Sequence, residues 1–424
     1  MSRRREEPPH LLEVGVRWPP ETFVGWKLEG LAAEGMRVTL ASNRVIDPEA
    51  RLEGVELFPI PARQPTRAGV TLYAFRASLA LLVRSPRRLV KLVRAVRRLS
   101  TARTKGRYGG AIGHLALCLP LARLRPDVVH FEWHRAAVDH LPLFDVWGCP
   151  VTTSCRGSDI SVYPHVPGWD DYATRLPEVL SRVGAVHCVS ESLMREAAAF
   201  GLDPAKAWVV RPGVDPEVFK PARQEGRDAA EEGEDVLRVI TVGWLRWEKG
   251  SEYALEAIRR LVDRGVPVQL EMIGSVPAER QTKTDERQRV LHTVADLGLE
   301  DRVHLHGHGS SAEVSRRLRA SDVLLHASVT EGIPAAITEA MACAVPVVAT
   351  ACGGVAEVIT DGVEGFLVPP REPDQLVEPL LRLWKDPGLR KRMGQAGRDR
   401  VLPELTIEQE HRAFLAMYRQ VTAA

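Results

Sequence analysis

Short apolar segments alternate with amphipathic segments along the whole chain. In the first half the apolar runs occupy residues 11–16, 36–42, 127–133 and 150–155, and in the second half they occupy residues 236–244, 269–274, 302–307, 322–328 and 345–350. Runs of this length, separated by helical patterns, indicate strands joined by helices, the arrangement that builds a parallel sheet. The pattern therefore predicts an α/β fold with two separate α/β halves.

Two segments mark the limits of these halves. Residues 221–235 are charged, contain glycine and lack apolar periodicity, which is typical of an exposed linker. Near the C-terminus, between residues 406 and 421, apolar residues recur among polar ones at helical spacing. We therefore predict domains at residues 1–220 and 221–405, followed by a C-terminal amphipathic helix at residues 406–424.

The overall composition places the chain among globular proteins. Its 424 residues exceed the size of a single hydrophobic core, and 45% of them are hydrophobic while 26% are charged. The formal net charge of +2 gives no indication of nucleic acid as a partner. The six cysteines form no C-x-x-C pair, and the first residues lack the apolar core of a signal peptide, so we expect a reduced, cytoplasmic setting.

The segment at residues 86–99 stands out by its charge. At helical spacing, five apolar residues share one face and six arginine or lysine residues cover the rest. A basic amphipathic helix can bind anionic lipid headgroups on the inner face of a membrane, but a helix docked on its own domain shows the same pattern. The sequence leaves both interpretations open.

A strand, a turn and a helix follow one another between residues 328 and 342. The helix is expected to begin near Pro334, where the missing N–H group of proline costs nothing. The free N–H groups from Ile333 to Ala336 suit a phosphate, because the helix dipole favours negative charge there. Glu331 and Glu339 lie beside this anion site, where carboxylates suit the hydroxyl groups of sugars.

These residues carry a resemblance to a known family. The stretch from Glu331 to Glu339 resembles the E-x7-E motif of the GT-B retaining glycosyltransferases of family four, and the segments around it resemble the family over most of the second half. The resemblance implies that Glu331 holds the donor sugar and that Glu339 holds the nucleotide ribose. It also implies two Rossmann-like domains facing each other across a cleft, with the C-terminal helix returning to the N-terminal domain.

A second match covers residues 241–258. It resembles the family segment V-G-R-L-x-x-x-K-G, whose arginine and lysine neutralise the departing diphosphate, and Lys249 occupies the lysine position. Trp244 stands at the arginine position, and Arg246 is the candidate to replace that arginine. The residues expected to bind the nucleotide sugar are Gly243, Lys249, Gly307, Glu331, Gly332, Ile333, Pro334, Ala335, Ala336 and Glu339.

The first half carries weaker matches. Residues 17–41 resemble the opening loop and first helix of the subgroup that reads S-E-T-F-I, which implies that Glu21 and Thr22 lie on the acceptor side. The usual glycine pair of that loop is missing. The contacts with the acceptor are therefore less well defined than those with the donor.

Two further segments of the first half depart from the family. In C-R-G-S-D-I, which resembles the family's H-G-x-D segment, Arg156 replaces histidine and Asp159 is retained, and both are assigned to the acceptor side. At the end of the strand that precedes this segment, Glu132 occupies the position of a family histidine that positions the donor sugar. His134 is the alternative for that role.

The sequence gives little reason to expect a metal. The three alternating histidines at residues 304–308 are a weak signal, because no carboxylate or cysteine joins them at ligand spacing. Asp-x-Asp, which holds a divalent cation in the other large glycosyltransferase architecture, is missing from the sequence. We therefore predict no metal and no cofactor, with Lys249, Arg246 and helix N-termini facing the diphosphate.

These observations predict a retaining, metal-independent glycosyltransferase. It is expected to move a sugar from a nucleotide diphosphate sugar to a hydroxyl of a saccharide or lipid-linked acceptor, in the synthesis of cell-surface polysaccharide or glycolipid. The expected catalytic residues are Glu331, Lys249, Arg246, Glu132 and His134. Two alternatives stay open: a nucleotide-sugar epimerase or phosphorylase on the same fold, and a catalytically silent binding subunit, which the replacements at Trp244, Arg156 and Glu132 favour.

Overall fold

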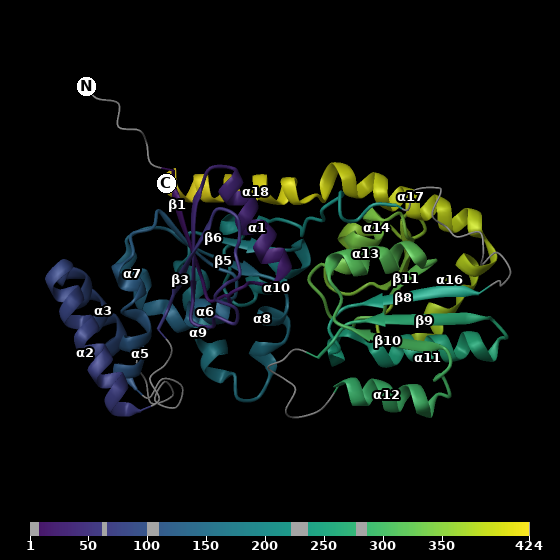
Figure 1. The fold of residues 1–424 in the computed structure, drawn as a ribbon, viewed down its shortest axis with the longest axis horizontal. Helices are drawn as coiled ribbons and strands as arrows, with labels where there is room; N and C mark the ends of the chain where they lie inside the picture. Colours follow the sequence, from purple (N-terminus) through teal and green to yellow (C-terminus); the bar gives the residue numbers. More distant parts are fainter. Residues whose placement is uncertain (1–7, 62–65, 100–109, 222–235, 277–285, 424) are drawn as a thin grey trace, which may run out of the picture. The chain divides into compact units, whose positions relative to one another are not determined.

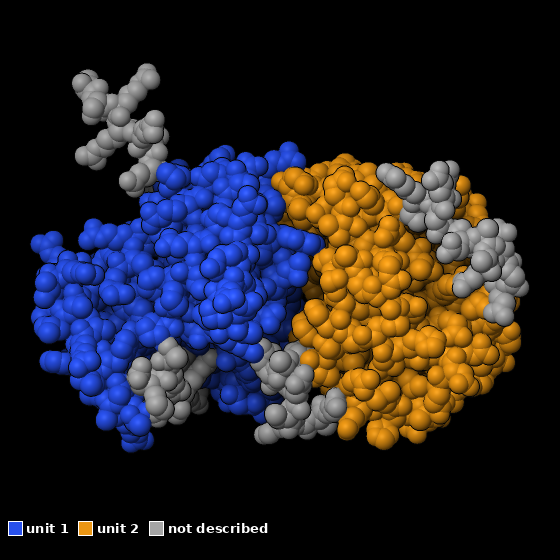
Figure 2. Space-filling model, in the orientation of Figure 1, with its two compact units in different colours: residues 1–189, 193–210, 411–424 blue, residues 190–192, 211–410 orange. Residues whose placement is uncertain are grey.

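The computed structural model describes residues 8–61, 66–99, 110–221, 236–276 and 286–423. The chain separates into two compact units, which Figure 2 draws in different colours. Unit 1 comprises Met1–Val189, Leu193–Val210 and His411–Ala424, and unit 2 comprises Ser190–Ser192 and Arg211–Glu410. The division therefore falls before residue 211, whereas the sequence places it after residue 220. The predicted linker lies outside the described residues, apart from Pro221.

Unit 1 is built on a parallel sheet, which has seven strands among the described residues (Figure 1). In sheet order these are β3 (Val55–Pro59), β2 (Arg37–Ser42), β1 (His10–Val14), β4 (Val128–Phe131), β5 (Val151–Cys155), β6 (Ala185–Cys188) and β7 (Ala207–Val209). The chain starts in the middle of the sheet, builds one edge and then crosses to the other. This order is that of a doubly wound, Rossmann-like fold.

Successive side chains of each strand point to opposite faces of this sheet, so residues next to each other in a strand belong to different apolar cores. Leu12 and Val129 belong to one apolar cluster, whereas Leu11 and Val128 belong to the other. Helices α1 (Thr22–Ala33) and α18 (Ile407–Ala423) cover the second of these faces. The first face is covered by α2 (Arg67–Arg84), α3 (Pro86–Leu99), α5 (Ala111–Cys118), α6 (His134–His140), α7 (Phe144–Trp147), α9 (Asp170–Arg182) and α10 (Glu191–Ala198), and α8 (Ser158–Ser161) follows β5.

Unit 2 is built on a second parallel sheet, with six strands in the described part of the chain. In sheet order these are β10 (Val303–Gly307), β9 (Val268–Ile273), β8 (Leu237–Val242), β11 (Val323–His326), β12 (Val347–Thr350) and β13 (Gly365–Val368). Its helices are α11 (Ser251–Asp263), α12 (Glu286–Asp296), α13 (Ser311–Ala320), α14 (Ala335–Ala342), α15 (Val355–Val358), α16 (Pro373–Lys385) and α17 (Pro387–Glu404). The strand order again starts in the middle, so this sheet is also Rossmann-like.

Every strand predicted from an apolar run is present, within about two residues at each end. The pattern missed β3, β6, β7 and β13. Of these, β3 and β7 are half-exposed edge strands, and a glutamate interrupts the apolar residues of β3. The C-terminal helix is present as α18, and its Phe414 and Tyr418 pack in a core of unit 1. All six cysteines are free thiols.

The basic helix predicted at residues 86–99 is present as α3, but its apolar face is already in use. Leu92, Ala95, Val96 and Leu99 are buried in the core of unit 1. The interpretation as a helix docked on its own domain is therefore correct for these side chains. No helix in the described part of the chain is long and apolar enough to cross a bilayer.

Candidate functional site

Lys249 and Glu331 meet at the carboxyl edge of the sheet of unit 2. Lys249 ends a short 3-10 helix, Trp247–Lys249, in the connection after β8, and Glu331 lies in the connection after β11. Because β8 and β11 are neighbouring parallel strands, the segments that follow them leave the same edge of the sheet. The ammonium of Lys249 donates a hydrogen bond to Oε1 of Glu331 at 2.5 Å. The two residues of the predicted donor site are thus in direct contact.

Close backbone approaches hold these two connections together. Gly250, with a φ of +64°, lies so near Ala327 that a Cβ atom at this position would be 2.0 Å from the carbonyl oxygen of Ala327. The N–H group of Val329 donates to the carbonyl of Glu248 at 2.8 Å. Only glycine fits at position 250, because a side chain would push the Lys249 segment away from β11.

The carboxylate of Glu331 is held by a polar group of neighbours. The hydroxyl of Ser328 donates to Oε1 at 2.8 Å, and Nε2 of His326 lies 3.1 Å from the same atom. Burial opposes ionisation of Glu331, but Lys249 and His326 outweigh it and hold the pKa of the carboxyl well below its usual range. Glu331 is therefore a carboxylate at any physiological pH.

The turn after Glu331 leads into α14 as predicted. Pro334 precedes the helix, which begins at Ala335, and the first N–H groups of any α-helix lack partners within it. Gly332, Ile333, Pro334 and Ala336 are buried, and Ala335 is exposed. The half-buried Glu339 lies on the same helix, and burial raises the pKa of its carboxyl to about 7. Unlike Glu331, Glu339 therefore titrates near neutral pH.

A hollow at this edge of the sheet is bordered by Lys249. Its wall is formed by Thr241, Val242, Gly243, Trp244, Leu245, Lys249, Ser251, Ala254, Met272, Ile273, Leu325, His326 and Ala327. Trp244 is 40% exposed, and its ring stacks on that of His308, with centroids 6.1 Å apart. Gly307, which ends β10, directly precedes this histidine. The predicted donor residues Gly243, Lys249 and Gly307 thus gather around one edge.

Arg246 takes a different partner from Lys249. Its guanidinium pairs with the carboxylate of Glu248, which is almost fully buried. Among the described residues the ion-pair partner of Glu331 in this segment is Lys249, and Arg246 pairs with Glu248 instead. Trp244 occupies the position of the family arginine, and the replacement of that arginine by Arg246 stays a prediction.

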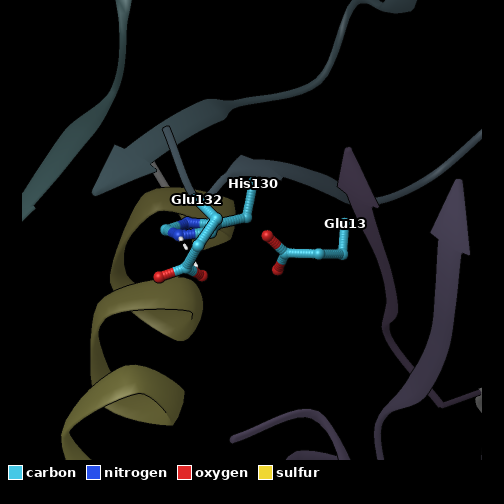
Figure 3. Close-up of side chains that lie close together, drawn as sticks. All are labelled: Glu13, His130 and Glu132. Atoms are coloured by element: carbon cyan, nitrogen blue, oxygen red, sulfur yellow. Dashed lines mark ion pairs between the residues drawn. The ribbon is translucent and has the colours of Figure 1, made fainter. Parts of the chain in front are cut away.

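The corresponding edge of unit 1 holds a charged cluster, which we call the inner cluster: the fully buried Glu13, Lys27 and Glu132, and Arg156, whose side chain is 10% exposed. The ammonium of Lys27 contacts Oε2 of Glu13 at 3.1 Å and also Oε2 of Glu132. Arg156 pairs with the other oxygen of Glu132. Figure 3 shows the two glutamates of this cluster with His130, which lies 3.8 Å from Glu132.

The surroundings of the inner cluster set the charge of its members. Burial disfavours the charged form of Glu132, but Arg156 and Lys27 outweigh it and lower the pKa of that carboxyl. Burial raises the pKa of Glu13 to about 8. Burial also lowers the pKa of His130, whose two nitrogens hydrogen-bond the hydroxyls of Thr152 and Ser154 at 2.8 Å. The histidine is therefore neutral, and the positive charge near Glu132 comes from Lys27 and Arg156.

Glu13, His130 and Glu132 each offer a ligand atom within 4.8 Å of the others, as a cation site requires. However, Lys27 contacts both carboxylates with its own positive charge. A divalent cation at this position would lie against an ammonium, which is electrostatically unfavourable. These residues therefore do not fit a metal site.

The remaining predicted residues of unit 1 lie in different surroundings. His134 is buried, and its backbone N–H donates to Oδ2 of the buried Asp159 at 3.0 Å. Glu21 precedes α1 and pairs with Arg17 at 3.2 Å, and Thr22 is the exposed first residue of that helix. Their predicted contacts with an acceptor, and the roles of Glu132 and His134 toward a donor, stay predictions.

The sequence did not single out His326, Ser328, Glu13 or Lys27. Glu13 and Lys27 do carry a signal, because each is a charged residue within an otherwise apolar strand or helix face. His326 and Ser328 lie on a strand end that the sequence did identify. Their contact with Glu331 follows only from the path of the turn.

Two family models match this chain and together cover most of it. The model described as glycosyl transferases group 1 matches residues 222–400, and the model described as Glycosyltransferase Family 4 matches residues 21–218. The chain belongs to this glycosyltransferase family. The family predicted from the motifs is therefore confirmed.

Individual relatives of this chain are also named as glycosyltransferases. It is 32% identical to the amylovoran biosynthesis glycosyltransferase AmsK of Erwinia amylovora, over 66% of this chain and 67% of that protein. It is also 32% identical to the D-inositol 3-phosphate glycosyltransferase of Kribbella flavida, over 53% of each chain. The first name refers to the synthesis of amylovoran and the second to D-inositol 3-phosphate.

Solved structures show the same fold. The glycosyltransferase is similar to Anabaena Alr3699/HepE, solved in complex with UDP and glucose, with a TM-score of 0.69 and 17% identity over 97% of this chain and 100% of that one. At this identity the likeness shows the fold alone. The predicted GT-B fold with two Rossmann-like domains is confirmed.

Proposed function

We propose that this glycosyltransferase is a retaining enzyme that needs no metal ion and takes its sugar from a nucleotide diphosphate sugar. The acceptor is a hydroxyl group of a saccharide or of a lipid-linked saccharide. The product belongs to cell-surface polysaccharide or glycolipid, a setting that the name of AmsK supports. The proposal depends mainly on one observation, the contact between Lys249 and Glu331 beside the N-terminus of α14.

The charges around this contact suit a diphosphate joined to a sugar. Lys249 supplies a positive charge that is 26% exposed, and the first N–H groups of α14 add the positive end of a helix dipole. A diphosphate bound there would compete with Glu331 for Lys249 and gain stabilisation as its negative charge grows on departure. These groups supply the positive charge that a divalent cation would otherwise provide.

The two glutamates suit the hydroxyl groups of the donor. In the described residues, the polar contacts of the Glu331 side chain are all made by Oε1, so Oε2 is available to a sugar hydroxyl. Glu339, on the helix that follows, is assigned to the ribose of the nucleotide. A carboxylate accepts strong hydrogen bonds from hydroxyl groups. Because Glu331 contacts Lys249, a sugar held by Glu331 has its anomeric carbon near Lys249 and is oriented for attack.

The reaction replaces one bond at the anomeric carbon with another. The bond to the diphosphate breaks and a bond to the acceptor oxygen forms, while the proton of the acceptor hydroxyl passes to the departing diphosphate oxygen. The nucleoside diphosphate leaves with its remaining charge stabilised by Lys249. Attack on the face from which the diphosphate departs keeps the configuration of the sugar.

A panel of UDP-, GDP- and ADP-sugars tests the proposal by calorimetric binding to the purified chain. The donor that binds is then incubated with saccharide and lipid-linked acceptors, with and without EDTA, and the anomeric configuration of the product is read by NMR. We expect a single preferred base, a product that keeps the donor configuration and no loss with EDTA. Lys249→Ala should abolish donor binding, whereas Lys220→Ala, which removes an exposed lysine of unit 2, should not.

Three results would contradict the proposal in different ways. Donor binding that survives both Lys249→Ala and Glu331→Gln would show that the site is elsewhere. An epimerised or phosphorolysed sugar formed without acceptor would identify a nucleotide-sugar epimerase or a phosphorylase on the same fold. Donor binding without any turnover across the acceptor panel would identify a binding subunit.

A further inference from the structure

Helix α2 exposes a continuous apolar face, which we call the α2 stripe: Leu72, Phe75, Leu79, Leu82 and Val83. These side chains are between 46% and 79% exposed, and they recur at intervals of three or four positions, with Val83 next to Leu82. Such spacing places them on one side of a helix. The opposite side, with Ala74 and Leu81, is buried in the core of unit 1.

The exposure of the α2 stripe is unusual within this chain. Elsewhere in the described residues the large exposed apolar side chains are scattered over many elements, as on most proteins. Here five of them follow one helix, and Val90 of the neighbouring α3 is also exposed. A contiguous apolar surface of this kind marks a site of interaction, because leaving it in water is costly.

The same helix pair concentrates positive charge. Helices α2 and α3, which lie side by side at the left of Figure 1, contain nine arginine or lysine residues and no aspartate or glutamate, although the whole chain carries a net charge of only +2. Eight of these cations are exposed: Arg67, Arg76, Arg84, Arg87, Lys91, Arg94, Arg97 and Arg98. The ninth, Arg88, is half-buried and donates to the carbonyls of Ala122 and Leu124.

We propose that the α2 stripe and the exposed cations of α2 and α3 form a docking surface for an anionic lipid bilayer. Leu72, Phe75 and Leu79 enter the interface between headgroups and acyl chains, and the arginines around them contact lipid phosphates. Helix α3 contributes its cations and the exposed Val90, because Leu92, Ala95, Val96 and Leu99 of its apolar face are buried. The membrane-contacting element is therefore α2 and not the helix that the charge pattern of the sequence singles out.

The combination of charge and apolar side chains selects this partner over others. A second copy of the chain would bring two strongly basic surfaces together, and their repulsion opposes association. A nucleic acid would use the cations but would leave the apolar stripe in water. An anionic bilayer satisfies both features at once, without a helix that spans it.

Vesicle flotation tests the proposal with the full chain. The vesicles contain either phosphatidylcholine alone or equal parts of phosphatidylcholine and phosphatidylglycerol. We expect strong binding to the anionic vesicles and weak binding to the neutral ones. Added salt should weaken the binding to anionic vesicles without removing it, because the apolar contribution is insensitive to screening.

Two sets of variants separate the apolar from the electrostatic contribution. Replacing Leu72, Phe75 and Leu79 together by serine should weaken binding to anionic vesicles at least about tenfold. Replacing Arg87, Lys91 and Arg94 by glutamate should remove the preference for anionic over neutral vesicles. The matched control replaces Leu291, Val363 and Leu402, three exposed apolar residues of unit 2, by serine and should bind like the wild type.

A spectroscopic readout locates the contact. With anionic vesicles, tryptophan emission from the Phe75→Trp variant should shift further to the blue than emission from the wild type. The Val363→Trp variant should show the same shift as the wild type. Failure of the wild type to float with anionic vesicles would overturn the proposal, as would wild-type binding by the stripe variant. A concentration-dependent dimer that the stripe variant abolishes, without vesicle binding by the wild type, would identify a second copy as the partner instead.

Discussion

The two units each hold a lysine that contacts a glutamate, yet the two clusters differ in their access to solvent. The side chains of Lys27, Glu13 and Glu132 are completely buried, whereas Lys249 is 26% and Glu331 10% exposed. Each cluster lies at the edge of a parallel sheet where the carboxyl ends of its strands meet. In unit 2 a hollow lies beside the lysine.

This difference indicates different roles for the same residue types. In the inner cluster Lys27 contacts Glu13 and Glu132, and Arg156 contacts Glu132, so these contacts stabilise one arrangement of unit 1. In unit 2 the ammonium of Lys249 and one oxygen of Glu331 can exchange partners when a ligand arrives. We therefore propose a structural role for the inner cluster and assign the proposed donor site to the Lys249–Glu331 pair, while the role of Glu132 toward a donor stays a prediction.

The largest effect on stability is expected for Lys27→Met. The substitution removes the positive charge that lies between the buried carboxyl groups of Glu13 and Glu132 and leaves the Glu132 carboxylate with Arg156 alone, and a buried charge that has lost a partner is strongly unfavourable. The free energy of unfolding should fall by about 3–5 kcal/mol, as measured by denaturant titration. The control is Lys220→Met, which breaks an exposed pair with Glu217 and should change that free energy by less than about 1 kcal/mol. Equal effects of the two substitutions would contradict the structural role of the inner cluster.

The largest effect on activity is expected for Glu331→Gln. The amide keeps the size of the side chain but loses the charge that fixes Lys249 and the donor. Sugar transfer should fall by about 10²- to 10³-fold in kcat, while the melting temperature stays close to that of the wild type. The matched control, Glu313→Gln, removes a glutamate of unit 2 that pairs with Arg316 and Arg317 on the surface. If that control lost as much activity, the assignment of Glu331 to the site would be wrong.

A smaller effect is expected from the titration of Glu339. Its pKa is raised to about 7, so the carboxylate form is lost as the pH falls through neutrality. If the carboxylate is the form that accepts ribose hydroxyls, nucleotide affinity should fall by about tenfold between pH 8 and pH 6. Calorimetry across this range measures the change. In Glu339→Gln only the titration of the nucleotide phosphates should remain, and an unchanged pH profile in this variant would rule out the role of Glu339.

The smallest effect on transfer is expected for Arg246→Ala. Since its guanidinium is paired with Glu248, it contributes less positive charge to the donor than Lys249 does. The rate should fall by less than about tenfold. A loss as large as that of Lys249→Ala, measured under the same conditions, would show that Arg246 does replace the family arginine at the position of Trp244.

Much of the fold followed from the sequence, because a buried parallel strand is a continuous apolar run. Two of the strands missed from the pattern, β3 and β7, are half-exposed at a sheet edge. In the site, the motif resemblance identified Lys249 and Glu331, and the structure brings them into contact. His326 and Ser328 were missed, since a serine and a histidine at a strand end carry no signal until the turn brings Glu331 back to them.

The sequence by itself determined the family and the two parallel sheets, and it suggested the residues of the proposed diphosphate site, because all three depend on local sequence patterns. The tertiary structure alone decided that Glu13, Lys27, Glu132 and Arg156 form one buried cluster, since these residues come from four separate segments. It also decided that α3 buries its apolar face while α2 exposes one. Local periodicity gives every amphipathic helix an apolar face, and only packing determines whether that face meets the core or the solvent.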